Sequence, residues 1–407
     1  MTDGLDLFDN VSENDHGSRR RPSRGRQAPV RRRKRRGLKW TIVLVLVLVI
    51  AGGAYFGIRQ FAGFGIYPDY SGSGDKSVVF QVNSGDTATD IGNNMLRAGV
   101  VKSTAAFVKV AKGSDQVGNV QPGFYVLREH MSASAALAAL VDRHSRVGLL
   151  EIKSGWQLDD TTSTAGKVTP GILSRIATAS CATLNGTKAC LTVAGLRAAI
   201  AGTDPAALGM PVWAIPSAKG ADQKHRFEGM IMPGVYNLKP GETATQTLKR
   251  IMDQSSIALQ AAGLPSANQQ STGFSPYQIL TLASIVERES GTTADMPKIA
   301  RVFFNRLQQG MDLQSDATVD YALDRPMVAT APADRPGAGA YDTYNISGLP
   351  PTPVSSPSSA AIQAATQPAA GTWLFFVVCQ KNGSSCFATN LADHNKNVQL
   401  AHNNGVF

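Results

Sequence analysis

The most regular hydrophobic pattern in this sequence runs from Ser275 to Gly291 and predicts one helix with both ends marked. Ser275 and Gln278 form a capping box of the S-x-x-Q kind, and Pro276 suits the first helical position. Gly291 is the natural residue to leave the helix in a left-handed turn. The residues between these ends leave almost no polar face, which predicts a mostly buried helix. The apolar positions are Ile279, Leu280, Leu282, Ala283, Ile285 and Val286.

Two carboxyl groups, those of Glu287 and Glu289, lie at the end of this helix, on either side of Arg288. Desolvation and the partial negative charge of a helix C-terminus both favour a protonated carboxyl, which is what a general acid needs near neutral pH. At about 100° per residue the two glutamates lie about 200° apart, so we do not expect them to face one cleft. The alternative is that both are ordinary last-turn residues and that one pairs with Arg288.

The remaining pattern predicts an α+β protein with a small N-terminal module and a larger C-terminal part. In the module, we expect strands at 78–82 and 123–127 and helices at 89–97, 103–112 and 132–143. Beyond it, we expect short strands at 149–153, within 227–236, at 373–378 (buried) and at the start of 387–394, which continues as a turn. Helices are expected at 158–167, 243–259, 295–309 and 358–367, and loops at 313–319 and 344–353.

A separate apolar run of nineteen uncharged residues extends from Trp40 to Ile58. As a helix it would span roughly 28 Å, about the thickness of a bilayer's hydrocarbon core. A buried strand of this length would need a turn signal, and a signal peptide would need a clear cleavage site. We therefore predict a single uncleaved transmembrane helix at 40–58. The basic residues before it place the N-terminus in the cytoplasm and residues 59–407 outside.

The charge of the chain is concentrated in its N-terminal tail. Residues 1–18 carry five acidic residues and no Lys or Arg, and residues 19–39 carry twelve Lys or Arg and no acid. Residues 40–407 therefore hold only +3 of the formal net charge of +10. A basic run can indicate a nucleic-acid partner. Next to a membrane span, topology and anionic lipids explain it instead, so we expect no nucleic-acid partner.

All four cysteines lie beyond the predicted span and form two close pairs. In an oxidising compartment, this spacing suggests two small disulfide loops, Cys181 with Cys190 and Cys379 with Cys386. A zinc site is the weaker alternative, because the spacings are not those of zinc knuckles and His394 is the only histidine nearby.

Two resemblances to known families follow from these motifs. The order of strand, Gly-Asp turn, helices and strand over residues 76–145 resembles the LysM-like domain of peptidoglycan-associated proteins. The C-terminal part contains, in this order, the motifs Leu282-Ala-Ser-Ile-Val-Glu-Arg-Glu289, Val302-Phe-Phe-Asn-Arg-Leu307, Leu313-Gln-Ser-Asp316, Thr318-Val319, Tyr344, Gly348-Leu-Pro-Pro351, Pro353, Phe387 and His394-Asn395. Together these motifs resemble the endolytic murein transglycosylase, or YceG-like, family, which is the second resemblance.

With these resemblances the chain is expected to divide into five parts. These are a cytoplasmic basic tail (1–39), a transmembrane helix (40–58), a Gly/Ser-rich linker (59–75), a LysM-like domain (76–145) and a mixed α/β catalytic domain (146–407). The catalytic domain has an elaboration at about 160–225, for which the sequence indicates no function.

The second resemblance implies a membrane-anchored lytic transglycosylase that acts on peptidoglycan. Such enzymes cleave the β-1,4 bond between N-acetylmuramic acid and N-acetylglucosamine without water and leave 1,6-anhydro-muramic ends, which would terminate growing glycan strands. The resemblance assigns catalysis to the first glutamate of the Ile-Val-Glu-x-Glu motif, Glu287. One carboxyl suffices, because the sugar's C6 hydroxyl replaces the water that hydrolases activate with a second carboxylate. No metal or organic cofactor is implied. The implied partners are glycan strands, the cytoplasmic membrane and nearby synthases or division and elongation proteins.

The polar residues of the matching motifs are predicted to line the cleft and bind sugar hydroxyls and N-acetyl groups. They are Gln314, Ser315, Asp316, Thr318, Tyr344, Asn345, His394 and Asn395. Each could instead be a structural loop contact. Two positions depart from the family pattern. Ala317 stands where proline is usual, and Pro233-Gly-Val-Tyr236 stands where Pro-Asp-Thr-Tyr is common.

A competing hypothesis is a catalytically silent scaffold that binds peptidoglycan and organises the synthesis machinery. The presence of Glu287, Gln314, Asp316 and His394 argues against it, because a silent relative would be free to lose them.

Overall fold

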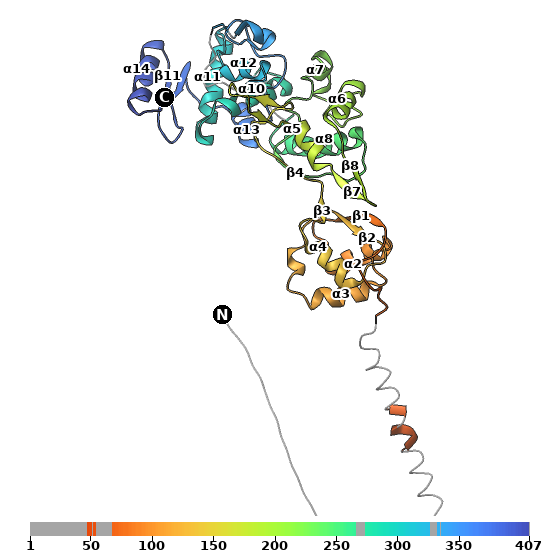
Figure 1. The fold of residues 1–407 in the computed structure, drawn as a ribbon. Helices are drawn as coiled ribbons and strands as arrows, with labels where there is room; N and C mark the ends of the chain where they lie inside the picture. Colours follow the sequence, from red (N-terminus) through yellow and green to blue (C-terminus); the bar gives the residue numbers. More distant parts are fainter. Residues whose placement is uncertain are drawn as a thin grey trace, which may run out of the picture. The chain divides into compact units, whose positions relative to one another are not determined.

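The computed structural model describes residues 47–50, 52–53, 67–265, 273–325, 332–333 and 335–406 (Figure 1). The chain divides into two units, Met1–Ile66 and Tyr67–Phe407. The predicted basic tail and most of the predicted membrane span lie outside the described residues, and the described residues 47–50 and 52–53 are helical. Within the described parts of the chain, no helix is both long and apolar enough to cross a bilayer. The membrane span and its topology therefore remain predictions.

The first domain of the second unit is a small α+β module with its own core. Its antiparallel sheet has the order β1 (Ser77–Val82), β2 (Gly123–Arg128), β3 (Arg146–Val147). Its helices are α2 (Ala88–Arg97), α3 (Thr104–Lys112) and α4 (Ala133–Val141), with a 3-10 turn η1 at Val117–Asn119. Strand residues Phe80 and Leu127 share one core with Met95, Phe107 and Leu140 of the helices. The predicted elements of this module are confirmed, while its LysM-like character remains a prediction.

The described part of the predicted linker, residues 67–75, is bound to this module. Asp69 accepts a hydrogen bond from the Ala133 N–H at the start of α4, at 3.0 Å. The Asp75 N–H donates to the Glu129 carbonyl at 2.8 Å. Gly74 has a φ of +84°, and a Cβ at this position would lie 2.4 Å from the Glu129 oxygen. Gly74 therefore permits close contact between two backbone segments. Composition alone does not distinguish this role of a glycine from its role in a flexible linker.

Residues 149–264 form a mostly helical layer beside a two-stranded ribbon. Strand β4 (Leu149–Ile152) pairs antiparallel with β9 (Gly234–Asn237). The helices are α5 (Ile172–Ala179), α6 (Val193–Gly202), α7 (Ile215–Gly220) and α8 (Ala244–Ala261). Two hairpins complete the layer, β5 (Thr161–Thr162) with β6 (Val168–Thr169), and β7 (Ala182–Leu184) with β8 (Thr187–Ala189). The predicted helix at 158–167 is wrong, because its β-branched threonines pair across a turn in which Gly166 has a φ of +78°.

The predicted central helix is α10 (Pro276–Glu289), and its N-terminal capping box is present. Its buried residues are Tyr277 and every residue from Ile279 to Val286. The prediction of a left-handed Gly291 is wrong. The helix ends with Ser290 as its cap, and the backbone of Gly291 packs against Gly383 so closely that a Cβ would lie 2.2 Å from the Gly383 oxygen.

Helices α11 (Met296–Gln308), α12 (Asp316–Ala322) and α13 (Ser359–Thr366) contact α10. The 3-10 turn η2 (Thr293–Asp295) contacts α11, and η3 (Arg335–Tyr341) contacts α12. These helices and residues 149–264 share one hydrophobic core. The polar loop predicted at 313–319 ends at Ser315, because helix α12 begins at Asp316.

The C-terminal segment consists of the ribbon β10 (Phe375–Val378) with β11 (Ser385–Ala388), followed by α14 (Leu391–Asn403). The predicted strand in 373–378 is present, but it is only partly buried because the ribbon has two strands. His394 and Asn395 lie in a helix rather than a turn, since Asn390 caps α14 by accepting from the Asp393 N–H at 2.9 Å. Both predicted disulfides, Cys181–Cys190 and Cys379–Cys386, are formed, so these cysteines do not make a zinc site.

Candidate active site

Glu289, the last residue of α10, is bound by the loop that leads into α12. Ser315 Oγ donates to Glu289 Oε1 at 2.5 Å, and the Ala317 N–H donates to the same oxygen at 3.4 Å. Burial raises the pKa of Glu289, and the charge of Asp316 adds to this effect, although both donors and Arg288 lower the pKa. Residue 289 as a whole is nevertheless partly exposed. A raised pKa is what a general acid near neutral pH needs.

Glu287 contacts a different segment, the start of α13. Its Oε2 atom accepts from the Ser358 N–H at 3.0 Å and from Ser358 Oγ at 2.5 Å. Ser358 is also the N-cap of α13, where it accepts from the Ala361 N–H. Glu287 therefore ties the end of α10 to the start of α13. This agrees with the expectation that the two glutamates face different directions.

The segment around Thr343 supports the loop that binds Glu289. The Gln314 N–H donates to the Thr343 carbonyl at 2.9 Å, and the Ser315 N–H donates to Thr343 Oγ1 at 3.0 Å. Beside this contact, Tyr344 donates its hydroxyl to Asp316 Oδ1 at 3.0 Å. Burial and the nearby Asp316 charge raise the pKa of Tyr344 to about 12, so its hydroxyl remains a donor at neutral pH. These contacts hold Ser315 and Asp316 beside Glu289.

Arg306 of α11 extends the site toward the C-terminal segment. Its guanidinium donates to the carbonyls of Leu374 at 2.7 Å and Leu313 at 2.8 Å, and it lies 5.3 Å from the centre of the Phe375 ring. The His394 ring stacks on the same Phe375 ring, with the ring centres 5.3 Å apart. Burial and the positive charge of Arg306 lower the pKa of His394. The charged form of this imidazole is therefore disfavoured beside a buried cation.

The residues predicted to line the cleft fall into three groups. Asp316, Tyr344 and His394 are partly exposed and lie in the contacts just described. Gln314, Asn345 and Asn395 are exposed, and Gln314 has a φ of +51°. Ser315 and Thr318 are buried, and their hydroxyls are engaged within the protein. The last two are therefore placed to support the site rather than to contact a substrate.

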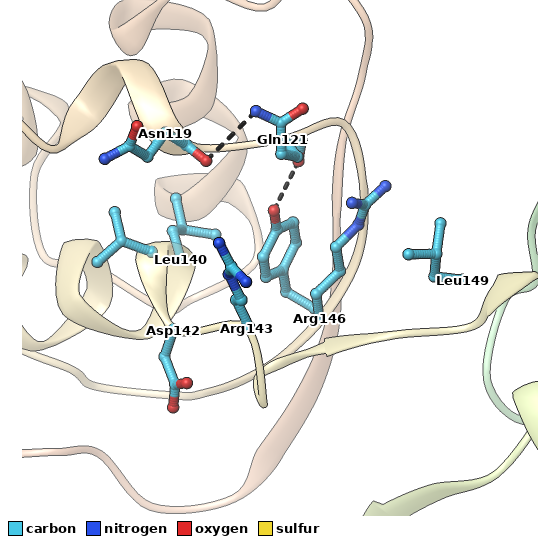
Figure 2. A pocket seen from close by; sticks show the side chains of 9 residues that line it. Asn119, Gln121, Leu140, Asp142, Arg143, Arg146 and Leu149 are labelled. Carbon is cyan, nitrogen blue, oxygen red and sulfur yellow. Dashed lines mark hydrogen bonds between the residues drawn. The ribbon is translucent and has the colours of Figure 1, made fainter. Parts of the chain in front are cut away.

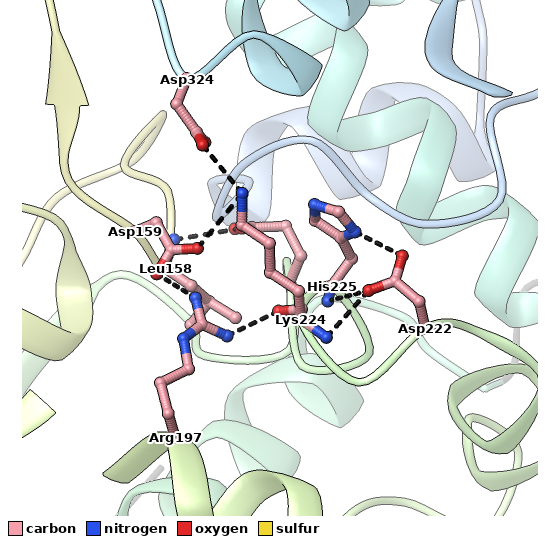
Figure 3. Close-up of polar contacts among 8 residues, drawn as sticks. Leu158, Asp159, Arg197, Asp222, Lys224, His225 and Asp324 are labelled. Atoms are coloured by element: carbon pink, nitrogen blue, oxygen red, sulfur yellow. Dashed lines mark hydrogen bonds and ion pairs between the residues drawn. The ribbon is translucent and has the colours of Figure 1, made fainter. Parts of the chain in front are cut away.

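A second buried carboxyl, Glu228, lies in the core. It is 2% exposed and accepts from the Leu158 N–H at 3.1 Å and from Tyr321, which follows Asp316 by five residues on α12. Burial raises the pKa of Glu228 to about 7. Figure 3 shows the ion pairs around Leu158, in which Lys224 bonds Asp324 at 2.8 Å and Arg197 pairs with Asp159. This network joins the 157–159 segment to the end of α12, and it leaves Glu228 without access to a substrate.

Two cavities lie away from both α10 glutamates. One, of about 620 Å³, is lined mainly by the small domain, including Asn119, Gln121, Arg143 and Arg146 (Figure 2). The other, of about 600 Å³, lies between β4 and α5.

No group of three or more His, Cys, Asp and Glu side chains in the described part of the chain is placed to hold a metal ion. Lytic transglycosylase chemistry as predicted from the sequence assigns no role to a metal.

Several site residues were missed in the sequence or were given no role. Ser358, Thr343 and Arg306 reach the glutamates only through contacts between distant segments. Glu289 was recognised as a last-turn carboxyl, but no role was assigned to it. The sequence motif Leu282–Glu289 includes this residue. The sequence alone does not show which of the two glutamates is bound by Ser315, because that contact joins segments 26 residues apart.

Comparison with known proteins places these motifs in a family. Residues 80–400 match the YceG-like family model. An endolytic murein transglycosylase of Streptococcus pneumoniae (strain ATCC BAA-255 / R6) is 26% identical over 373 residues, which is 87% of this chain and 63% of that protein. The endolytic murein transglycosylase of Bacillus subtilis (strain 168) is 32% identical over 178 residues, covering 42% of this chain and 47% of that protein.

A solved structure supports the fold. The putative YceG-like protein from Listeria monocytogenes, a 2.6 Å crystal structure, aligns with a TM-score of 0.50 and 24% identity over 79% of this chain and 99% of that one. The present chain spans 63% of the length of its pneumococcal relative, so the relative's activity is not transferred with the match. The family match covers most of the chain and agrees with the motifs identified in the sequence. This chain belongs to the YceG-like family.

Proposed function

We propose that this protein is an endolytic peptidoglycan transglycosylase that uses Glu289 as its general acid and then as its base. The observation that carries the proposal is the environment of Glu289. The residue is partly exposed, the pKa of its carboxyl is raised by burial, and its Oε1 atom is bound by two donors, the Ser315 hydroxyl and the Ala317 N–H. The names of the curated relatives support the same reaction class.

The two halves of the reaction use the two states of this carboxyl. Protonated Glu289 gives its proton to the oxygen that leaves when the β-1,4 bond between N-acetylmuramic acid and N-acetylglucosamine breaks. The resulting carboxylate is stabilised by the Ser315 and Ala317 donors. It then removes the proton of the muramic C6 hydroxyl, whose oxygen bonds to C1. The product is a 1,6-anhydro-muramic end, and Glu289 has its proton again.

We infer a catalytic role for Glu289 rather than for Glu287, the residue assigned from the sequence, because the partners of the two side chains differ. Glu287 is engaged by the N-cap of α13, a structural contact between two helix ends. Glu289 is engaged by the motif around Ser315 and Asp316, next to the exposed Gln314 and the partly exposed Tyr344. Three of the residues predicted to contact sugar, Ser315, Asp316 and Tyr344, therefore lie around Glu289.

The location of the protein is part of the proposal. The apolar run at 40–58 and the basic residues before it support a single span with a cytoplasmic N-terminus. The two disulfides support an extracytoplasmic position for the folded part. The substrate would then be nascent glycan strands at the outer face of the membrane, with the synthases and the division or elongation proteins as neighbours.

The test uses full-length protein in detergent with purified peptidoglycan, and mass spectrometry of the products. We expect anhydro-muramyl ends from the wild type and from Glu287→Gln at reduced yield, but none from Glu289→Gln. Loss of product in Glu287→Gln alone would return the catalytic role to Glu287.

Two other outcomes would change the reaction class. Reducing ends would show that water is the acceptor, and Asp316, beside Glu289, would be the second carboxyl that a hydrolase needs. A wild-type protein that sediments with peptidoglycan but releases nothing would be a scaffold.

A further inference from the structure

The cavity between β4 and α5 has no role in the reaction described above. Its volume is about 600 Å³, within the usual range for small-ligand pockets. Its lining includes Leu149, Glu151, Lys153, Trp156, Arg175 and Thr178. The set contains two cations, one carboxylate and one large aromatic ring.

Trp156 and Arg175 form the distinctive part of this lining. The Arg175 guanidinium lies 3.6 Å from the centre of the Trp156 ring, which is a stacked cation–π contact. Arg175 Nε donates to the Pro170 carbonyl at 3.0 Å, which fixes the orientation of the guanidinium. The contacts of the described residues include no partner for its two terminal nitrogens. A fixed guanidinium with free terminal nitrogens is suited to bind a carboxylate in bidentate fashion.

The same segment is joined to the end of α10. The Ser356 N–H donates to the Trp156 carbonyl, and the Gly155 N–H donates to the Ser356 carbonyl, both at 2.8 Å. Arg288, which lies between the two α10 glutamates, donates to the Gly155 carbonyl at 3.5 Å. Ser356 precedes by two residues the Ser358 that binds Glu287. The backbone at Gly155 and Trp156, beside the cavity, therefore contacts both Ser356 and Arg288.

We propose that this cavity is a subsite for a carboxylate-bearing N-acetylated sugar of the strand whose cleavage is proposed above. Arg175, held on Trp156, binds the carboxylate, and Lys153 adds a second positive charge at the rim. This inference rests on the proposed function for the identity of the polymer. Because Arg175 covers one face of the Trp156 ring, a carboxylate contact is favoured over simple stacking of a neutral sugar.

Two sources of the carboxylate are available on such a strand. The lactyl group of muramic acid is a free acid where no peptide is attached, and the stem peptide carries carboxylates where it is attached. The subsite is defined by the shared chemistry, and the two sources are separated by the choice of probe.

The test is calorimetric titration of the full-length Glu289→Gln protein in detergent, which binds without turnover. The probes are neutral di-N-acetylchitobiose, the disaccharide N-acetylglucosaminyl-muramic acid, and the same disaccharide with its tetrapeptide. Arg175→Ala and Arg175→Lys are compared with Arg143→Ala, which removes an exposed arginine from the other cavity.

We expect Arg175→Ala to weaken binding of at least one anionic probe by about tenfold or more, the scale of a lost charge-assisted contact. Arg175→Lys should recover part of this loss, and Arg143→Ala should have no effect. The anionic probe that responds identifies the source of the carboxylate. Equal binding of neutral and anionic probes, or no difference between Arg175→Ala and Arg143→Ala, would overturn the subsite.

This outcome is independent of the proposed function. If the wild type makes no anhydro ends but Arg175→Ala still weakens binding of an anionic probe, the reaction fails and the subsite stands. If the wild type makes anhydro ends but Arg175→Ala leaves the affinity for the anionic probes unchanged, the subsite is wrong and the proposed reaction is retained.

Discussion

The end of α10 and the interior around Glu228 each place a carboxyl where burial raises its pKa, yet they differ in access. Glu289 is partly exposed, and its donors are Ser315, which precedes α12, and Ala317 in the first turn of that helix. Glu228 is 2% exposed and bonds to segments on both sides of the core. Helix α12 links the two, since Ser315 precedes it and Tyr321 lies near its end.

This comparison shows that a raised pKa does not by itself identify a catalytic acid. Desolvation acts on any buried carboxyl, so the shift is shared by a functional group and a structural one. Access to the surface and the identity of the bound partners separate them. The following predictions test the difference between Glu289, proposed as the catalytic acid, and Glu228, a structural carboxyl.

The largest effect is expected at Glu289. Glu289→Gln keeps the size of the side chain but removes the proton that the reaction transfers, so kcat should fall by about 10³-fold. Glu287→Gln, two residues away, should cost less than about tenfold, because it weakens only the contact with Ser358. Release of anhydro-muramyl products under single-turnover conditions checks both variants. Equal losses would show that the two glutamates act together.

Glu228 should affect the free energy of unfolding rather than the chemistry. Its pKa is about 7 in the native state, above the ordinary value of 4.5, so the folded protein holds a proton that the unfolded chain loses between these pH values. Its contribution is fully present below pH 4.5 and is lost as pH rises to about 7, by on the order of 3 kcal/mol. Glu228→Gln should therefore show a much flatter dependence of stability on pH.

Denaturant unfolding of the wild type and Glu228→Gln at pH 5 and pH 8 measures this difference. The exposed Glu151, changed to Gln, is the matched control and should leave the pH dependence unchanged. Parallel curves for wild type and Glu228→Gln would contradict the assigned role.

The two disulfides offer the next comparison, because they close loops of similar length, with sequence separations of 9 and 7, in different parts of the fold. Replacing either pair by serine should lower stability by about 2–3 kcal/mol. Only Cys379 and Cys386 close the hairpin whose Gly383 packs on Gly291 and whose Ser385 N–H donates to Asp295 at 2.8 Å. Loss of that pair should therefore also lower kcat several-fold, while loss of Cys181–Cys190 should not. Activity assays beside thermal unfolding distinguish the two effects.

A smaller effect is expected from Ser315→Ala. The Ser315 hydroxyl stabilises the carboxylate of Glu289, so its removal raises the pKa of Glu289 further. The acid form then persists to higher pH, so the alkaline limb of the pH profile of kcat should shift to higher pH. The rate itself should fall by about tenfold or less. Ser290→Ala is the control, since its hydroxyl bonds the Val286 carbonyl instead. An unmoved alkaline limb would remove Ser315 from the site.

The smallest change is Ala317→Pro, which restores the residue usual in the family. Proline is tolerated in the first turn of α12 but has no N–H, so the 3.4 Å contact with Glu289 is lost. The alkaline limb should shift in the same direction as in Ser315→Ala, but by less. A shift toward lower pH would show that the Ala317 N–H does not bind the carboxylate.

Much of this structure follows from local sequence. The capping box at Ser275 and Gln278, the order of elements in the small domain and the pairing of the cysteines depend on neighbouring residues, and all are present. Local patterns failed where tertiary contacts override them. Residues 158–167 form a hairpin arm, and His394 lies on a helix that packs on the β10–β11 ribbon.

The sequence by itself determined the family, the helix and the pair of carboxyls at its end, because motifs, caps and periodicity are properties of adjacent residues. It also determined that the two glutamates face apart, since the helical rotation per residue is constant. Only the tertiary structure decided which partners each glutamate has. Ser315 lies 26 residues beyond Glu289 and Ser358 lies 71 residues beyond Glu287, and burial and hydrogen bonding arise from the packing of these distant segments.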